Sequence, residues 1–141
     1  MADNPQSPPV RERPLSPFLS IYKWPITMAT SITHRATGVA LSVGMILVAW
    51  ALIALASGPD MYQPFTTAIA SPVGLIVLFG FLWSLVFHFL NGIRHLAWDL
   101  GYGFAVAAAN RSGVAVIALS VLIAAGVFAY GWWALHGGFH P

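Results

Sequence analysis

Long runs of apolar residues alternate with short polar segments along the 141 residues of this chain. The runs cover residues 36–56, 72–92 and 113–135, and none of them contains Asp, Glu, Lys or Arg. At about 1.5 Å of rise per residue, a helix of about 20 residues crosses a hydrocarbon core of roughly 30 Å. The pattern predicts an all-α integral membrane protein with three transmembrane helices.

Prolines, glycines and charged residues set the expected boundaries. We expect a polar N-terminal arm at 1–25, transmembrane helices at 26–56, 71–94 and 113–135, an external loop at 57–70, a cytoplasmic loop at 95–112 and a short external tail at 136–141. The six Lys and Arg residues lie before the first apolar run or between the second and the third: Arg11, Arg13, Lys23, Arg35, Arg94 and Arg111. The positive-inside bias therefore places the N-terminus in the cytoplasm.

Composition narrows the function classes. The chain is 58% hydrophobic and only 7% charged, whereas soluble domains have about 25% charged residues. It has no cysteine, which excludes disulfides and thiolate metal ligands, so a redox role requires a bound organic cofactor. The net charge of +2 without a basic run excludes a nucleic-acid surface.

Polar residues recur every three or four positions on the first two spans, which places each set on one helix face. The first set is Thr27, Ser31, His34, Arg35, Gly38 and Ser42, and the second is Ser84, His88, Asn91, His95 and Asp99. Because both sets cluster toward the cytoplasmic side, we expect the two faces to meet. The third span has no comparable set and is expected to pack and support.

Three of these positions suggest chemistry. His88 is the only histidine well inside a span, and a neutral imidazole there suits an axial ligand of haem iron, although a hydrogen bond to a neighbouring helix is the alternative. Ser31 and Arg35, one turn apart, supply a hydroxyl and a fixed cation for quinone carbonyls. The position of Arg35 alone favours an interfacial anchor, and Ser31 alone could simply start the helix.

The remaining polar residues have simpler interpretations. Asp99 is expected to pair with Arg94 or Arg111 rather than to relay protons. His136 and His140 lie on the opposite side of the membrane from the two polar faces and are expected to be incidental.

Three local sequences together resemble the cytochrome b subunit of succinate dehydrogenase. They are Arg13-Pro-Leu-Ser-Pro-Phe-Leu-Ser-Ile-Tyr22, Ser31-Ile-Thr-His-Arg-Ala-Thr-Gly38 and His88-Phe-Leu-Asn-Gly-Ile-Arg-His-Leu-Ala-Trp-Asp99. The resemblance spans the arm and the first two helices. One departure is Phe18, where many members of the family have histidine, and it affects the expected details of docking.

The resemblance implies a membrane-anchor subunit of succinate dehydrogenase (quinone) that does not itself carry out succinate chemistry. A second small anchor subunit would complete the helix bundle and share one haem b, with His88 as this chain's axial ligand. Ser31 and Arg35 match the ubiquinone-site residues, and His34 and His95 are expected near the haem propionates or the quinone.

The same resemblance implies partners and a location. A flavoprotein subunit and an iron–sulfur subunit would dock on the cytoplasmic face, with the arm against the iron–sulfur subunit. The absence of an evident presequence favours the bacterial inner membrane over the mitochondrial one. A self-contained dihaem anchor is excluded because it needs four histidine ligands within its spans, whereas a haem-free membrane scaffold or transporter component remains open. Ligation of one haem by both His34 and His88 is less expected, because the two residues are placed at different depths.

Overall fold

The computed structural model describes residue 15 and residues 21–138 of the chain, and this part is helical with no strand. Its elements are α2 (Ile26–Ala56), α3 (Pro59–Ala70), α4 (Pro72–Asp99) and α5 (Val106–Trp133), followed by a π-helical turn at Ala134–Gly138. Three helices, α2, α4 and α5, are long and apolar enough to cross a membrane. The prediction of an all-α protein with three transmembrane helices is confirmed. Most of the arm at 1–25 lies outside the described residues.

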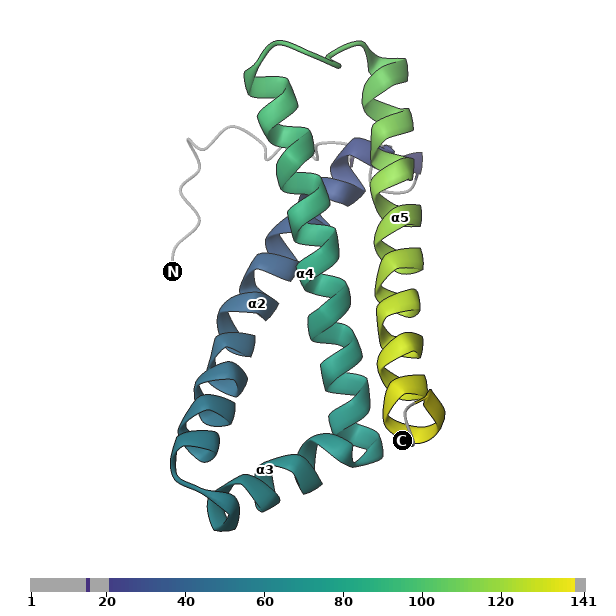
Figure 1. Ribbon diagram of the computed structural model, residues 1–141. Helices are drawn as coiled ribbons and strands as arrows, with labels where there is room; N and C mark the ends of the chain where they lie inside the picture. The colour runs from purple at the N-terminus through teal and green to yellow at the C-terminus, as the bar shows by residue number, and fades with distance from the viewer. Residues whose placement is uncertain (1–14, 16–20, 139–141) are drawn as a thin grey trace, which may run out of the picture.

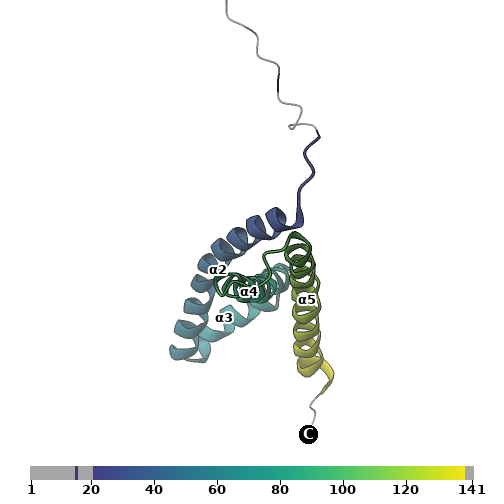
Figure 2. The ribbon, with the colours of Figure 1, turned by 90° about the horizontal axis from the view of Figure 1, so that it is seen from above.

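Helix α4 is the centre of the arrangement. It packs against α2 on one side and α5 on the other, while the short helix α3 runs across the far end from α2 to α4 (Figures 1 and 2). The start of α2, the end of α4 and the start of α5 lie together at the top of Figure 1. We call this the basic end, because Lys23, Arg35, Arg94 and Arg111 lie toward it.

Local sequence explains where the helices begin and end. Pro25 precedes α2 in an extended conformation, and Gly58 follows it with a φ of 98°, a value that side chains other than glycine rarely adopt. Ser71 caps α4, since its Oγ accepts a hydrogen bond of 3.1 Å from the backbone N–H of Gly74. Gly58 and Ser71 therefore interrupt the helical backbone, so that α2, α3 and α4 are separate helices.

The loop expected at 57–70 is mostly helical. Pro59 occupies the first turn of α3 and Asp60 adds a negative charge there, and both features favour a helix start. Phe65 packs edge-on against Trp50 of α2, with 5.0 Å between the ring centroids. The sequence Ser-Gly-Pro-Asp therefore ends one helix and also begins the next.

The second and third spans are longer than the apolar runs suggest. Helix α4 continues to Asp99 instead of ending at 94, and α5 begins at Val106 instead of 113. An apolar run marks the part of a helix that lies in hydrocarbon, but the helix continues wherever its polar residues find partners or water. Arg94 is such a residue, because it is only 6% exposed and hydrogen-bonded to its neighbours.

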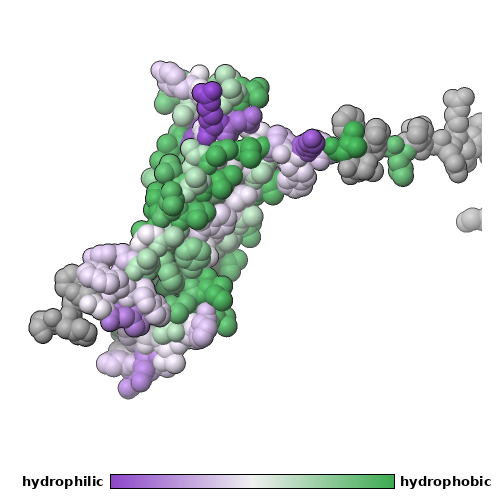
Figure 3. Space-filling view, turned by 90° about the vertical axis from the view of Figure 1, so that its right-hand side faces the viewer, coloured by the Kyte–Doolittle hydropathy of each residue, from purple (hydrophilic) through white to green (hydrophobic). Residues whose placement is uncertain are grey.

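Polar and small side chains fill much of the space between the helices, while large apolar side chains face outward. The buried polar and charged residues are Thr30, Thr37, Ser84, Asn91, Arg94 and Ser120. On the face shown in Figure 3, hydrophobic residues form a band between two more hydrophilic ends. This distribution is typical of helices that associate within lipid.

Candidate functional site

Three histidines gather where α2 and α4 pack together near the basic end. The rings of His34 and His88 are stacked, with centroids 3.9 Å apart and planes 13° from parallel. His95 is tilted by 57° to His34 at 5.2 Å. The expectation that the two polar faces meet is therefore confirmed, and we call these three residues the histidine cluster.

The hydrogen bonds of His88 determine which of its ring nitrogens carries the proton. Its Nδ1 lies 3.1 Å from the carbonyl oxygen of His34 and 3.3 Å from Oγ1 of Thr37. A carbonyl oxygen only accepts, and the Thr37 hydroxyl donates to the same carbonyl at 3.0 Å. The neutral ring is therefore protonated on Nδ1, which leaves the lone pair of Nε2 free to bind a metal ion.

Gly38 of α2 allows His88 to lie this close to the helix. A Cβ atom at Gly38 would approach Cε1 of His88 to 3.1 Å, which is tighter than most Cβ contacts. A glycine here, one turn after His34, thus makes room for the stacked imidazole.

His34 has an unusual polar atom. Its Nε2 is the one buried side-chain nitrogen or oxygen in the described residues that has no hydrogen-bond partner. Buried polar atoms are nearly always paired in folded proteins. The geometry thus leaves a hydrogen-bonding position for a group that does not belong to the described part of this chain.

The stacking also corrects one premise about the histidines. His34 and His88 were expected at different depths, but their rings lie face to face at one level. Two axial ligands of one iron must direct their ring nitrogens at it from opposite faces of a porphyrin, and rings 3.9 Å apart leave no space for one. In this arrangement the pair does not ligate one haem from both sides.

A single axial histidine is nevertheless compatible with this geometry. No group of three or more His, Asp and Glu side chains in the described residues is arranged to hold a metal ion. Haem needs no such group, because the porphyrin supplies four ligands and the protein supplies only the axial ones. With Nδ1 donating to α2 and Nε2 free, His88 fits that requirement.

Ser31 and Arg35 lie on α2 beside the histidine cluster, one turn apart on either side of His34 in sequence. Arg35 is exposed, Ser31 is partly buried, and neither makes a hydrogen bond or ion pair within the described part of the chain. Their polar groups are thus available to an external ligand, although the structure contains none.

Arg94 is a site residue that the sequence pattern did not single out. Its Nε donates to Ser112 Oγ at 2.9 Å, one terminal nitrogen donates to Thr30 Oγ1 at 3.2 Å and Asn91 Oδ1 at 3.3 Å, and the other donates to the Ala109 carbonyl at 2.9 Å. The guanidinium carbon also lies 4.1 Å from the centre of the Trp98 ring. A single side chain therefore connects α2, α4 and α5.

The expected pairing of Asp99 with Arg94 or Arg111 is not found. No ion pair joins these residues in the described part of the chain, and Asp99 is exposed. Every acceptor of Arg94 is a neutral oxygen. The reason is geometric, since Arg94 turns into the bundle whereas Asp99 lies outside at the last turn of α4.

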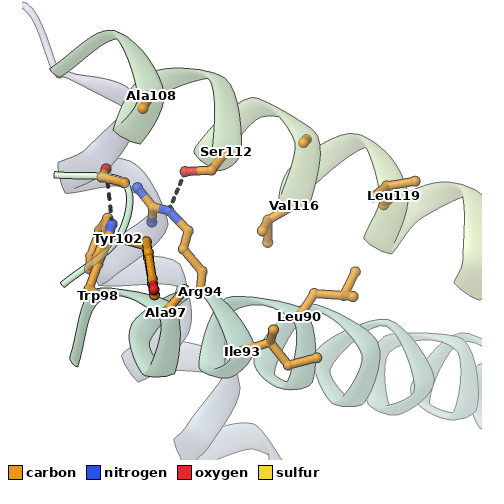
Figure 4. Close-up of a pocket in the computed structure, with 12 residues that line it drawn as sticks. Leu90, Ile93, Arg94, Ala97, Trp98, Tyr102, Ala108, Ser112, Val116 and Leu119 are labelled. Carbon is orange, nitrogen blue, oxygen red and sulfur yellow. Dashed lines mark hydrogen bonds between the residues drawn. The ribbon is translucent and has the colours of Figure 1, made fainter. Parts of the chain in front are cut away.

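A groove of about 380 Å³ lies on the other side of α4 from the histidine cluster, between α4 and α5. Figure 4 shows Leu90, Val116 and Leu119 along it, with Arg94 and Ser112 joined at one end. No histidine lines this groove. Its lining is mostly apolar and its polar end is already hydrogen-bonded, so the chemistry belongs to the histidine side of α4.

Comparison with known proteins identifies the family. Residues 9–127 match the family described as succinate dehydrogenase/fumarate reductase transmembrane subunit. The chain belongs to this family. It is 42% identical to the succinate dehydrogenase cytochrome b556 subunit of Paracoccus denitrificans, over 79% of this chain and 86% of the relative. It is also 44% identical to the mitochondrial cytochrome b560 subunit of Mus musculus, over 83% of this chain and 70% of the relative.

Membership of the transmembrane-subunit family agrees with the three apolar helices and makes the chain a multi-pass membrane protein. The resemblance inferred from the three local sequences is confirmed. Within this family chain, His34, His88 and His95 are brought together, while Ser31 and Arg35 lie beside them on α2. His136 is at the opposite end, in the π-helical turn, and His140 lies outside the described residues.

Proposed function

We propose that this chain is a membrane-anchor subunit of succinate dehydrogenase that binds haem b through His88 and ubiquinone through Ser31 and Arg35. The observation that carries the proposal is the His88 ring, which donates from Nδ1 to α2 and keeps Nε2 free. Family membership supplies the biological setting. Haem b, when bound, supplies a one-electron redox centre at this end of the bundle.

The second axial ligand would come from a second small anchor subunit. His88 and His95 are partly exposed, so this chain alone does not enclose the histidine cluster. The stacked pair leaves no place for a porphyrin between His34 and His88. Both observations support a haem held between two subunits, with the partner covering the open side of the cluster.

His34 and His95 would bind oxygen atoms of the ligands. The buried Nε2 of His34 lacks a partner in the described residues, and a haem propionate or a quinone carbonyl would supply one. Because the two rings are neighbours, one ligand oxygen could lie within reach of both. This would place the propionates or the quinone toward the basic end.

Ser31 and Arg35 would bind ubiquinone at its carbonyl oxygens. Reduction of a quinone builds up negative charge on those oxygens, and a fixed guanidinium stabilises that charge more than it stabilises the neutral ring. The Ser31 hydroxyl would donate a hydrogen bond and orient the head group. Electrons would reach the quinone from succinate through a flavoprotein and an iron–sulfur subunit docked at the basic end, which we assign to the cytoplasmic side.

The proposal is tested by purifying the complex in mild detergent. A flavoprotein, an iron–sulfur protein and a second small anchor should accompany this chain, and the complex should show a b-type band. Arg35→Ala should lower quinone reduction by succinate at least about tenfold, while reduction of an artificial dye persists. Arg111→Ala is the control, since Arg111 is an exposed arginine of the same end.

Two results would contradict this function. Equal loss of quinone and dye reduction in Arg35→Ala would indicate failed assembly instead of a quinone contact. A purified complex without a b-type band would favour a haem-free scaffold in which the polar faces serve only helix packing.

A further inference from the structure

Arg94 determines how the amide of Asn91 is oriented. One terminal nitrogen of Arg94 lies 3.3 Å from Asn91 Oδ1, and an arginine nitrogen can only donate. The amide oxygen must therefore face Arg94. Asn91 is fully buried, so the amide has no solvent to turn toward.

The orientation of Asn91 in turn fixes the proton on His95. The amide nitrogen of Asn91 lies 3.1 Å from Nε2 of His95. An amide NH2 group has two donors and no acceptor, so Nε2 must accept and cannot carry a proton. The proton of the neutral His95 ring is therefore on Nδ1.

The ring of His95 is also restrained from both sides. It is tilted against His34 at 5.2 Å and lies edge-on to Trp98 at 5.1 Å, and Trp98 is itself held over the guanidinium of Arg94. Its Nδ1 makes no hydrogen bond with the described residues and is not among the buried unpaired atoms. The N–H group is therefore unpaired and not fully buried, so it is accessible to a group outside the described part of the chain.

We propose that Arg94 and Asn91 are positioning residues that hold His95 as the Nδ1–H tautomer, which then donates a hydrogen bond to a ligand oxygen. This inference rests on the proposed function, because that oxygen belongs to a haem propionate or to a quinone carbonyl. Both are acceptors, so the same N–H suits either. Helix α5 takes part through Ser112 and the Ala109 carbonyl, which hold the far side of the Arg94 guanidinium.

Asn91→Asp is the sharpest variant for this proposal. A carboxylate keeps the size of the side chain and still accepts from Arg94, but it can only accept from His95. The contact with Arg94 is kept while the tautomer of His95 is reversed, with the proton on Nε2. A purely structural role of Asn91 would survive this change.

Nitrogen NMR of the ¹⁵N-histidine-labelled complex reads the tautomer directly, with the His95 signals assigned by their loss in His95→Gln. Wild-type His95 should show a protonated Nδ1, and Asn91→Asp should show a protonated Nε2. A wild-type His95 protonated on Nε2 would overturn the proposal. This readout does not depend on turnover.

Kinetics and redox titration then identify the acceptor. In Asn91→Asp, a rise of about tenfold or more in the KM for ubiquinone, with the haem midpoint potential unchanged, indicates a quinone carbonyl. A shifted midpoint potential with an unchanged KM indicates a propionate. If neither changes while the tautomer reverses, His95 donates to no ligand and the proposal fails.

Two control variants separate charge from tautomer. Asn110→Asp adds the same charge at an exposed position of the basic end and should change neither quantity. Asn91→Leu removes both hydrogen bonds without adding charge. The quantity that changes in Asn91→Asp, either the KM for ubiquinone or the haem midpoint potential, should therefore also change in Asn91→Leu, but by less. If the effect of Asn91→Asp came from its charge alone, Asn91→Leu would behave like the wild type. A wild-type complex that lacks both a b-type band and quinone reduction would instead refute the proposed function and leave the NMR result standing.

Discussion

At the scale of single residues, hydrogen-bond chemistry fixes the states of side chains that sequence patterns only locate. His88 is protonated on Nδ1 because a carbonyl of α2 faces that nitrogen. His95 is protonated on Nδ1 because an amide donor faces its Nε2. Each ring thus has a second nitrogen that makes no hydrogen bond in the described residues, free to ligate in His88 and protonated in His95.

Arg94 provides a prediction about stability. In Arg94→Met the hydroxyls of Thr30 and Ser112 keep their backbone bonds, and Ser112 still donates to the Ala109 carbonyl. Asn91 Oδ1 then loses its only hydrogen bond in the described residues, and an unpaired buried acceptor costs about 1–3 kcal/mol. The apparent melting temperature of the purified complex should fall.

The matched control for this prediction is Arg111→Met. Arg111 is exposed and lies on α5 at the same end of the bundle. Its replacement should leave the melting temperature near that of the wild type. An equal fall in both variants would show that positive charge at this end matters more than the buried hydrogen bonds.

The sequence located the histidine cluster but not the residues that hold it. Polar positions that recur every three or four residues on two helices were enough to predict that the two polar faces meet, but not that His34 and His88 lie at one level. Arg94, however, has the sequence signature of a basic residue at a membrane boundary, and only the packing of α5 shows that it turns inward. Thr30 and Thr37 gave no signal either, since threonines in a span commonly bond their own helix.

At the scale of helices, close contact between α2 and α4 brings the histidines together. Gly38 makes room for His88, and Gly44 lies directly against the ring of Phe81. Small residues let helix backbones approach in lipid, where packing and hydrogen bonds replace the hydrophobic effect. The distance between these helices therefore depends on single glycines.

Gly44→Ala tests this dependence. A Cβ atom there would overlap the Phe81 ring, so α2 and α4 must separate or the ring must move. We expect a lower yield of assembled complex and a lower melting temperature. Phe81→Leu should restore part of the loss in the double variant, because it vacates the space that the new methyl group needs.

Gly126→Ala is the reference substitution for Gly44. A Cβ atom at Gly126 of α5 meets nothing within 4 Å, and alanine favours a helix over glycine by up to about 1 kcal/mol. This variant should be neutral or slightly stabilising. A similar loss in both variants would contradict the role of close packing at Gly44.

Helix ends were less predictable than helix positions. Hydropathy predicts the three spans, but residues 95–112 were assigned to a loop because charged residues lie there. In the structure α4 continues to Asp99 and α5 already begins at Val106. It also missed α3, because Pro59 and Pro64 suggest irregular structure although a proline in the first turn favours a helix. Capping and tertiary partners, which hydropathy ignores, decide these ends.

At the scale of the whole molecule, the three long helices place the candidate binding residues together at one polar end. The histidine cluster, Arg35 and the Arg94 hydrogen bonds all lie toward the basic end, while α3 covers the other end between α2 and α4 (Figure 1). An electron donor docked outside the membrane would have the shortest path to ligands at this end. The function thus depends on which side of the membrane the basic end faces.

Thiol labelling tests this orientation. The chain has no cysteine, so Asn110→Cys at the basic end and Gln63→Cys on α3 each give it a single exposed thiol. In intact cells, a membrane-impermeant maleimide should label Gln63→Cys on this chain, and should label Asn110→Cys only after permeabilisation. The reverse pattern would refute a cytoplasmic basic end.

The axial role of His88 is the central claim, and a reduced-minus-oxidised spectrum of the purified complex tests it most directly. His88→Leu should lose or strongly alter the b-type band, because it removes the ring whose Nδ1 is held by α2 and whose Nε2 is free to ligate. His136→Leu, at the opposite end, should keep the band unchanged. An unaltered low-spin band in His88→Leu would contradict the account.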